Sequence, residues 1–374
     1  MDPIPIPARR RDGNAAGCFS MPSLRSNRAM SARTLLWGMM GVLLVSALGI
    51  RADSNERAFL DRCGALAAEA SMLGTSVVEG RDGWLFFAQE LRHLGAGRFW
   101  GERAVDVSRA TRADAADPLP AILAFKHELD KRGVKLLMVP VPPKAVVYPD
   151  KLPDPNDEAR NEPPPRMDPH HQAFHDLLRS EDIEVLDLTG PFLENRQHDQ
   201  GPLYCLQDTH WSGVGAVLAA EQIAAFLRRE VNLPNREALD AEWRTVEITG
   251  DLWRMLDERD RERERLNLRR IGAPEPDRDS PILLLGDSHN LVFHGGGDMH
   301  ARGAGLPDQL AYELGFAVDV VAVRGSGATP ARINLLRRAQ RDPEFWDNKE
   351  IVIWCFSARE FTESDGWRIV PVAP

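Results

Sequence analysis

The pattern of apolar and polar positions predicts alternating helices and buried strands over most of the chain. From residue 118 onward, segments with helical spacing of apolar residues alternate with short, nearly continuous apolar runs. The predicted helices are 118–132, a segment ending near 180, 213–229, 306–315 and 331–340. The predicted strands are 135–141, 183–188, 281–285, 317–323 and 350–356. Apolar strands that alternate with helices indicate a mainly parallel sheet covered on both faces, so we expect an α/β fold.

Three further segments complete the pattern. Residues 54–73 have helical spacing, and residues 80–87 predict a tight turn that leads into an aromatic strand. Residues 257–270 are dense in charges of both signs. We expect this last segment to be a solvated helix or a mobile insertion without chemistry of its own.

The N-terminal region has a different composition. Residues 1–33 are rich in proline, serine and arginine, and an apolar run follows at residues 34–50, closed by Arg51. Seventeen residues is near the lower limit for spanning a hydrocarbon core of about 30 Å, so the run predicts a signal anchor or the apolar region of a signal peptide. The arginines before it predict that the N-terminus stays in the cytoplasm and that the rest is exported.

The predicted anchor or signal peptide divides the chain into three parts. We expect a cytoplasmic or untranslated segment at residues 1–33, since Met21 and Met30 are alternative starts. Residues 34–51 form the anchor or signal region, and residues 52–374 form the exported domain. No clean Ala-x-Ala cleavage site follows the apolar run, which favours an anchor that is not cleaved.

Charge and cysteine content narrow the choice of partners. Leaving out residues 1–52, with seven basic and two acidic residues, leaves 39 basic and 54 acidic residues and a net charge near −15. Nucleic acid is therefore not expected as a partner. Three cysteines follow the apolar run, and a disulfide between Cys63 and Cys205 is one possibility that spacing alone does not decide.

The end of the strand 281–285 carries a candidate nucleophile. The strand runs directly into Gly286, Asp287 and Ser288, and ligands of open α/β sheets bind beyond the carboxyl ends of strands. Gly286 permits a sharp turn, which would leave Ser288 exposed at the start of the next helix. The backbone N–H groups of Ser288 and His289 would then face a developing oxyanion. The alternative is an ordinary turn with a helix-capping serine.

A serine nucleophile needs a base that a third group orients. Asp208 and His210 lie two residues apart, just before the predicted helix 213–229, and they would supply that base and its carboxylate partner. By itself an Asp-x-His sequence is often structural. Paired with the serine turn, it predicts a Ser288–His210–Asp208 triad.

The end of the strand 317–323 is the third informative position. Arg324, Gly325 and Gly327 follow it, and bare glycine N–H groups there would supply a second oxyanion donor. A plain glycine-rich turn is the alternative. Trp211 is a candidate for stacking on sugar rings, with burial in the core as the other outcome.

These motifs resemble those of a known family. Gly-Asp-Ser after a strand, with an Asp–His pair on one loop, resembles the SGNH (GDSL-type) hydrolases, although here the Asp-x-His precedes the serine. The order of five segments is similar to that of the alginate O-acetyltransferase family of the AlgJ/AlgX type: 80–86, 139–149, 208–211, 286–288 and 354–361. The resemblance implies an SGNH-like three-layer fold with permuted motif order.

The resemblance also implies a function. It implies a periplasmic enzyme, anchored to the inner membrane through residues 34–50, that takes acetyl onto Ser288 and passes it to a hydroxyl of an exopolysaccharide. His210 would be the general base and then the acid, Asp208 would orient it, and the loop at 325–327 would belong to the oxyanion site. A membrane-bound O-acyltransferase-type partner would relay the acetyl group, and no cofactor is implied. His289 departs from the small or hydrophobic residue expected after the nucleophile.

The sequence leaves three alternatives open. An exported esterase would use the same triad, and sequence hardly separates it from a transferase. A metal-dependent enzyme would use some of six residues as ligands, namely Asp208, His210, Asp287, His289, His294 and His300. A non-catalytic polysaccharide-binding scaffold would keep the triad without turnover. The acidic charge leaves both an alginate-like polymer and a neutral polysaccharide such as cellulose possible.

Overall fold

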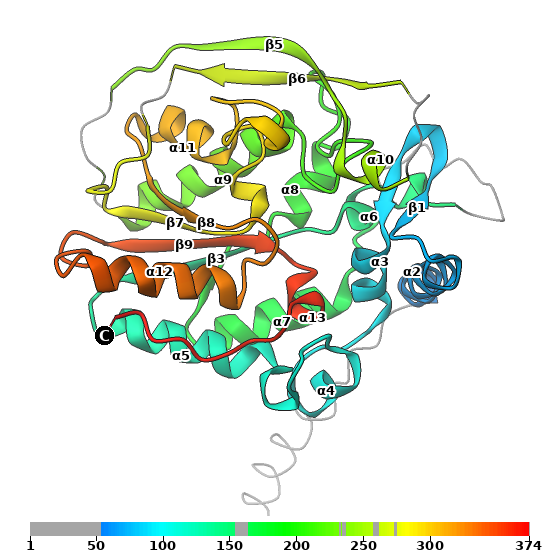
Figure 1. The fold of residues 1–374 in the computed structure, drawn as a ribbon, viewed down its shortest axis with the longest axis horizontal. Helices are drawn as coiled ribbons and strands as arrows, with labels where there is room; N and C mark the ends of the chain where they lie inside the picture. The colour runs from blue at the N-terminus through cyan, green and yellow to red at the C-terminus, as the bar shows by residue number, and fades with distance from the viewer. Residues whose placement is uncertain are drawn as a thin grey trace, which may run out of the picture. The chain divides into compact units, whose positions relative to one another are not determined.

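A five-stranded parallel sheet forms the centre of the molecule (Figure 1). The computed structural model describes residues 54–153, 164–231, 233, 237–256, 262–272 and 275–373. The strand order is β4-β3-β9-β7-β8. The strands are β3 (Lys135–Val141), β4 (Glu184–Val185), β7 (Ile282–Gly286), β8 (Asp319–Ala322) and β9 (Ile351–Ser357). All five predicted strands are present, and the predicted α/β fold is confirmed.

Helices cover both faces of this sheet, which gives three layers (Figure 1). One face packs against α9 (Gly213–Glu230) and α11 (Leu306–Leu314), and the other against α5 (Pro118–Asp130), α7 (Pro169–Ser180) and α12 (Thr329–Arg341). Strand β9 illustrates why its sequence is apolar throughout. Ile353 and Cys355 lie in the core of the first face, whereas Val352 and Trp354 lie in that of the second.

Further helices and a hairpin lie outside these layers. The other α-helices of the described ranges are α2 (Ser54–Leu73), α3 (Ala88–Gly95), α4 (Ala104–Val107), α6 (Lys144–Val147), α8 (Thr189–Glu194), α10 (Asp251–Met255) and α13 (Glu360–Glu363). The tight turn and the aromatic strand predicted from residues 80–87 are present, and strand β2 (Leu85–Phe87) pairs antiparallel with β1 (Val77–Glu79), which was not predicted. The turn places Asp82 and Gly83 at φ 55° and 79°, a region that glycine enters readily and aspartate tolerates.

The charge-dense segment corrects one expectation. Residues 264–271 are neither a helix nor an insertion, because they form β6 (Glu264–Ile271), which pairs antiparallel with β5 (Ala241–Ile248). Buried Glu264, Leu266 and Leu268 alternate with more exposed residues on β6. This period of two was hidden by the high content of arginine and glutamate. Residues 257–261 lie outside the described part of the chain.

The structure tests the prediction for the cysteines but not the one for the N-terminal segments. Cys63, Cys205 and Cys355 are free and buried, so the possible disulfide between Cys63 and Cys205 is not formed. Within the described ranges, no helix is both long and apolar enough to cross a membrane. The anchor predicted at residues 34–50 and the segment 1–33 lie outside those ranges. Anchoring and the division into three parts therefore stay predictions.

Candidate active site

The turn after β7 places Ser288 at the start of a short helix, as the sequence predicts, but the side chain is buried, so the expectation that it is exposed is wrong. The strand ends at Gly286, and a short 3-10 helix spans Ser288–Asn290. Gly286 is required because a Cβ there would lie 1.7 Å from the carbonyl oxygen of Cys355 on the adjacent strand. The carboxylate of Asp287 caps the helix by accepting the N–H of His289 at 2.9 Å. The parallel sheet thus holds Ser288 at its carboxyl edge.

The three predicted triad residues lie in hydrogen-bonding sequence. The Oγ of Ser288 lies 2.7 Å from Nε2 of His210, and Nδ1 of His210 lies 2.6 Å from Oδ1 of Asp208. Asp208 accepts the Nδ1 proton, which leaves Nε2 free to accept the serine hydroxyl proton. Ser212 caps α9 by accepting the N–H groups of Val214 and Gly215, so the helix begins at Gly213, three residues after His210.

A tight hairpin-like loop carries the base and its partner. Residues 204–211, which we call the Asp-His loop, begin and end with the backbone bridge between Tyr204 and Trp211. Within it, the N–H of Cys205 donates to the carbonyl of His210 at 3.2 Å. This backbone pairing fixes the direction in which Asp208 and His210 project.

The carboxylate of Asp208 is fully engaged. Its Oδ1 also accepts the N–H of His210, and its Oδ2 accepts the N–H of Asp251 at 2.8 Å. Nε2 of a second histidine, His300, lies 2.9 Å from the same Oδ2. The triad aspartate therefore lies between two imidazole rings.

The pKa values of Asp208 and His210 are shifted by their contact with each other. Burial acts to raise the pKa of Asp208, but its contacts with His210 and His300 outweigh burial, and the pKa lies well below its usual value. Burial acts to lower the pKa of His210, yet the Asp208 carboxylate more than offsets this, and the pKa is raised. The pair thus favours an ionised aspartate and a more basic imidazole.

One predicted oxyanion donor is unavailable. The N–H of His289 is occupied by Asp287, so the expectation that it faces an oxyanion is wrong. The ring of His289 does not compete for Ser288 either, since its Nδ1 lies 3.2 Å from Asp287 and its ring packs beside those of His210 and Trp211. The N–H of Ser288, at the first position of its helix, needs no partner within that helix.

The glycine-rich loop after β8 lies beside the nucleophile turn. A Cβ on Gly327 would meet the Cβ and backbone nitrogen of Asp287 at 3.1 Å, so the two backbones are in close contact. Gly325 is exposed at φ 100°. Ser326 donates a hydrogen bond to the buried carboxyl of Glu360, and this bond anchors the loop. Burial raises the pKa of Glu360 to about 7.

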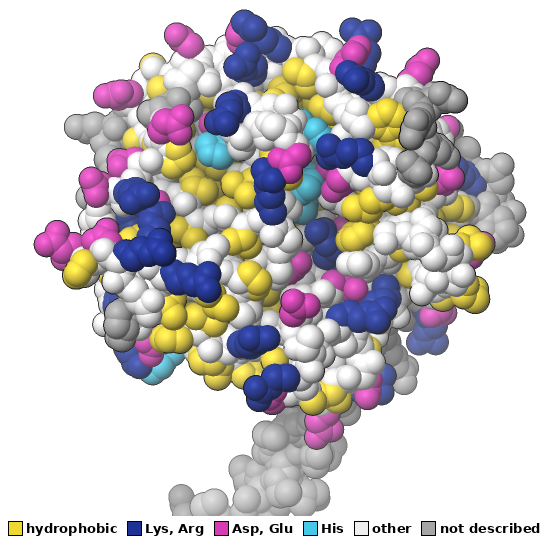
Figure 2. Space-filling model, in the orientation of Figure 1, with side chains coloured by type: hydrophobic (Ala, Val, Ile, Leu, Met, Phe, Trp, Pro, Cys, Tyr) yellow, Lys and Arg dark blue, Asp and Glu magenta, His cyan; other side chains and the backbone are white. Residues whose placement is uncertain are grey.

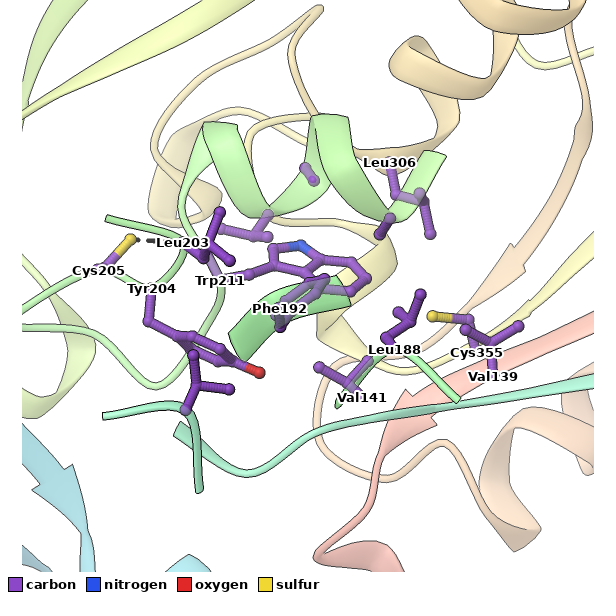
Figure 3. Close-up of a cluster of buried hydrophobic side chains, with 14 of the residues drawn as sticks. Val139, Val141, Leu188, Phe192, Leu203, Tyr204, Cys205, Trp211, Leu306 and Cys355 are labelled. Atoms are coloured by element: carbon purple, nitrogen blue, oxygen red, sulfur yellow. Dashed lines mark hydrogen bonds between the residues drawn. The ribbon is translucent and has the colours of Figure 1, made fainter. Parts of the chain in front are cut away.

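The predicted role of Trp211 is contradicted, whereas that of Arg324 stays a prediction. The prediction that Trp211 stacks on a sugar ring is wrong, because its ring is fully buried among Leu188, Phe192 and Leu203 (Figure 3). Arg324 is exposed and pairs with Asp298 at 2.5 Å, so it links the glycine-rich loop to the loop that carries His300. Acidic and basic side chains are interspersed on the face shown in Figure 2, and histidine side chains are visible near the centre of this face.

Sequence reasoning missed several groups that surround the triad. Asp251 accepts the N–H and hydroxyl of Thr209, next to the base, at 2.8 and 2.6 Å. Lys144 and Glu264 are buried and contact the backbone of the Asp-His loop. Arg359 is 8% exposed and donates to Ser357 Oγ at 2.9 Å. Lys144 has one sequence signal, a charged residue within a proline-rich and apolar segment, whereas Glu264 is one charge among many in residues 257–270.

Potential metal ligands gather at the triad itself. The ligand atoms of Asp208, His210 and Asp251 lie within 4.8 Å of one another, the one group of three found in the described ranges. Each of these side chains already takes part in the hydrogen bonds given above. A metal ion bound there would have to replace the bond between His210 and Asp208.

Comparison with known proteins agrees with the fold and the motifs. A probable alginate O-acetylase, AlgJ, of Pseudomonas aeruginosa is 30% identical over 152 residues, which is 41% of this chain and 33% of that protein. The chain thus spans about a third of the length of that curated relative. The O-acetyltransferase domain of Pseudomonas putida AlgJ has the same fold, with a TM-score of 0.56 and 23% identity over 77% of this chain and 92% of that domain.

A second solved structure and a family model extend this agreement. AlgX of Pseudomonas aeruginosa aligns with a TM-score of 0.52 and 20% identity over 76% of this chain and 63% of AlgX. Residues 77–358 match the model of the SGNH hydrolase-like domain of the acetyltransferase AlgX, which is three quarters of the chain. The chain therefore belongs to the AlgX family of SGNH hydrolase-like acetyltransferases.

Proposed function

We propose that this protein is an O-acetyltransferase that carries acetyl on Ser288 and transfers it to a hydroxyl of an exopolysaccharide. The observation that carries the proposal is the hydrogen-bonded series Ser288, His210 and Asp208 at the carboxyl edge of the sheet, in a chain of an acetyltransferase family. The residue types and distances are those that nucleophilic acyl transfer requires.

In the first half-reaction the serine is acetylated. His210 Nε2 takes the hydroxyl proton as Ser288 Oγ attacks the carbonyl carbon of an acetyl ester. The tetrahedral oxyanion is stabilised by the N–H of Ser288 and by the loop at 325–327. The carbon–oxygen bond to the leaving group then breaks, and that oxygen takes the proton from His210.

In the second half-reaction the acetyl group moves on. A sugar hydroxyl gives its proton to His210 and attacks the acetyl carbon, and Ser288 leaves with that proton. Water in place of the sugar would make the protein an esterase, which is the principal alternative. Placement of the acceptor and exclusion of water decide between the two.

Substrate, partner and location extend the same proposal. The name of the relatives points to alginate as the acceptor, whereas a net charge of −10 for this chain also suits a neutral polymer. A membrane-bound O-acyltransferase-type partner would deliver acetyl in the periplasm. Residues 34–50 would hold the enzyme at the inner membrane.

The test is mass spectrometry of the full-length chain after incubation with 4-nitrophenyl acetate. We expect one acetyl group on Ser288, absent from Ser288→Ala and strongly reduced in His210→Ala. Ser180→Ala, which replaces an exposed serine at the end of α7, and His198→Ala, which replaces an exposed histidine, serve as matched controls.

A chase distinguishes transfer from hydrolysis. The acetylated protein is mixed with oligouronates, with neutral oligosaccharides or with buffer alone. Faster loss with one oligosaccharide, together with its acetylation, supports transfer and identifies the polymer class. Equal loss in every mixture supports the esterase, and failure to acetylate Ser288 at all would refute the triad. Activity that a chelator abolishes would favour metal chemistry.

A further inference from the structure

Two sequence motifs have no part in the acetyl-transfer steps, yet they meet at one residue. They are the segment 80–86, with Trp84 and Phe86, and the segment 139–149, which contains Lys144. Lys144 is 2% exposed, and its ammonium lies 5.2 Å and 5.4 Å from the centres of the Trp84 and Phe86 rings. Both motifs therefore surround one buried positive charge.

The ammonium of Lys144 binds backbone rather than a carboxylate. Nζ donates to the carbonyls of Leu85, Leu206 and Asp208, at 2.6, 3.0 and 3.1 Å. Three acceptors match the three protons of an ammonium group. Two of them belong to the Asp-His loop, and one is the backbone carbonyl of the triad aspartate itself.

Glu264 of β6 holds the same loop through its N–H groups. Its two carboxylate oxygens accept the N–H of Leu206 at 2.7 Å and that of Gln207 at 3.0 Å. Strand β2 adds a further bond, since the N–H of Leu85 donates to the carbonyl of Leu206 at 2.8 Å. The backbone between 206 and 208 is thus held from three elements that are distant in sequence, α6, β6 and β2.

We propose that Lys144, supported by Glu264, is a positioning residue that holds the Asp-His loop so that Asp208 and His210 stay aligned with Ser288. The inference rests on the proposed triad. A buried charge with three backbone partners makes movement of the loop costly, because each carbonyl that moves away leaves a donor unsatisfied. Misalignment by about 1 Å is enough to slow such a reaction on the order of 100-fold.

The chain offers a matched control for a buried lysine. Lys349 is 5% exposed and donates to the carbonyls of Arg278 and Ser280 at 2.5 and 2.8 Å. It lies before β9, at the amino edge of the sheet, opposite to Ser288. Both lysines are buried cations that bind backbone carbonyls, although Lys349 also pairs with Asp319 at 3.3 Å, and only Lys144 contacts the Asp-His loop.

The experiment compares Lys144→Met with Lys349→Met in the full-length protein. The rate of Ser288 acetylation per folded molecule is measured with 4-nitrophenyl acetate, and the low-field proton resonance of the His210–Asp208 bond is recorded by NMR. For Lys144→Met we expect a loss on the order of 100-fold in kcat with little change in KM, and a shifted or absent resonance. Lys349→Met should retain both properties.

Further variants keep the test decisive. If Lys144→Met does not fold, Lys144→Arg retains the charge, but a planar fork does not reach three converging carbonyls, so both readouts should still change. Glu264→Gln should cause a smaller loss. Unchanged rate and resonance in folded Lys144 variants would overturn the proposal. The resonance can be read even if the parent acquires no acetyl group, so failure of the triad chemistry is a separate result.

Discussion

At the scale of single residues, the proposed chemistry depends on how tightly His210 binds its proton. The Asp208 carboxylate outweighs burial and raises the pKa of His210, whereas the pKa of Asp208 itself lies well below its usual value. Protonated His210 therefore adds to the free energy of unfolding. This contribution is fully present below the ordinary pKa of histidine and is lost as pH rises through the raised pKa of the folded state. Ionised Asp208 likewise adds to the free energy of unfolding. Its contribution is present above the ordinary pKa of aspartate and is lost as pH falls through the lowered pKa of the folded state.

The same shift predicts the pH dependence of acetylation. Only neutral His210 accepts the serine proton, so the rate should rise with pH through a midpoint above the ordinary histidine value of about 6.5. Asp208→Asn should lower that midpoint and reduce the rate on the order of 10⁴-fold. Rapid-mixing measurement of 4-nitrophenol release from about pH 5 to 9 provides the profile. A rate independent of pH in this range would argue against His210 as the base.

His300 gives a second prediction at this scale. It contacts the outer oxygen of Asp208, and its backbone lies at φ 71°, a strained conformation for a residue other than glycine. His300→Ala should reduce kcat about tenfold and leave KM nearly unchanged, because the lost bond orients Asp208 and does not touch substrate. His300→Gln, whose amide can donate, should recover part of the loss.

The same loop supplies the control for His300. His294 binds Asp308 at 3.0 Å, so His294→Ala should leave kcat within about twofold of the parent while it removes a histidine of the same loop. Equal effects of the two alanine variants would mean that the loop, and not the contact with Asp208, matters for the rate.

At the scale of elements, the start of α10 packs directly on the Asp-His loop. A Cβ on Gly250 would lie 1.8 Å from the carbonyl oxygen of Gln207 and 2.8 Å from the backbone nitrogen of Asp208. Gly250→Ala should therefore move the loop, with a loss on the order of 100-fold in acetylation and about 1–3 kcal/mol in the free energy of unfolding. Thermal unfolding and the acetylation assay measure the two effects.

A second glycine offers a control with the same substitution. At Gly272 an added Cβ would meet no atom within 4 Å, and φ there lies outside the left-handed region. Gly272→Ala should change the free energy of unfolding by less than about 0.5 kcal/mol and leave acetylation intact. An active Gly250→Ala variant would show that the loop tolerates displacement at this contact.

Elements also explain how far sequence alone predicted this protein. The strands of the central sheet were recognised because burial on both faces makes them apolar throughout, and their ends located Ser288. Strand β6 was missed because its exposed positions are charged and its buried ones include Glu264. The direction of Trp211 was not predictable, because an aromatic residue beside a candidate catalytic histidine suits the core as well as a substrate.

The supporting contacts were out of reach for a different reason. Lys144 and Glu264 act on backbone carbonyl and N–H groups of the Asp-His loop, and these groups are the same for every residue type. The partners lie more than 50 residues apart in sequence. Only the folded arrangement brings a lysine after β3 and a glutamate on β6 to the same short loop.

At the scale of the whole molecule, three thiols lie in different parts of one hydrophobic core. Cys63 lies on α2, Cys205 on the Asp-His loop and Cys355 on β9, and all three are buried and belong to the same hydrophobic cluster. Burial raises the pKa of each thiol above its usual value. Since the thiolate is the reactive form, alkylation requires the surrounding core to open.

This arrangement predicts that the three thiols react together. In native buffer near pH 8, iodoacetamide should modify Cys63, Cys205 and Cys355 at one slow rate, because each becomes accessible through the same global opening. Peptide mass spectrometry over time measures the three rates separately, and denaturant should raise them in parallel. Faster modification of Cys205 would mean that the Asp-His loop opens independently of the sheet. In that case the bonds from Lys144 and Glu264 would not hold the loop as firmly as their geometry indicates.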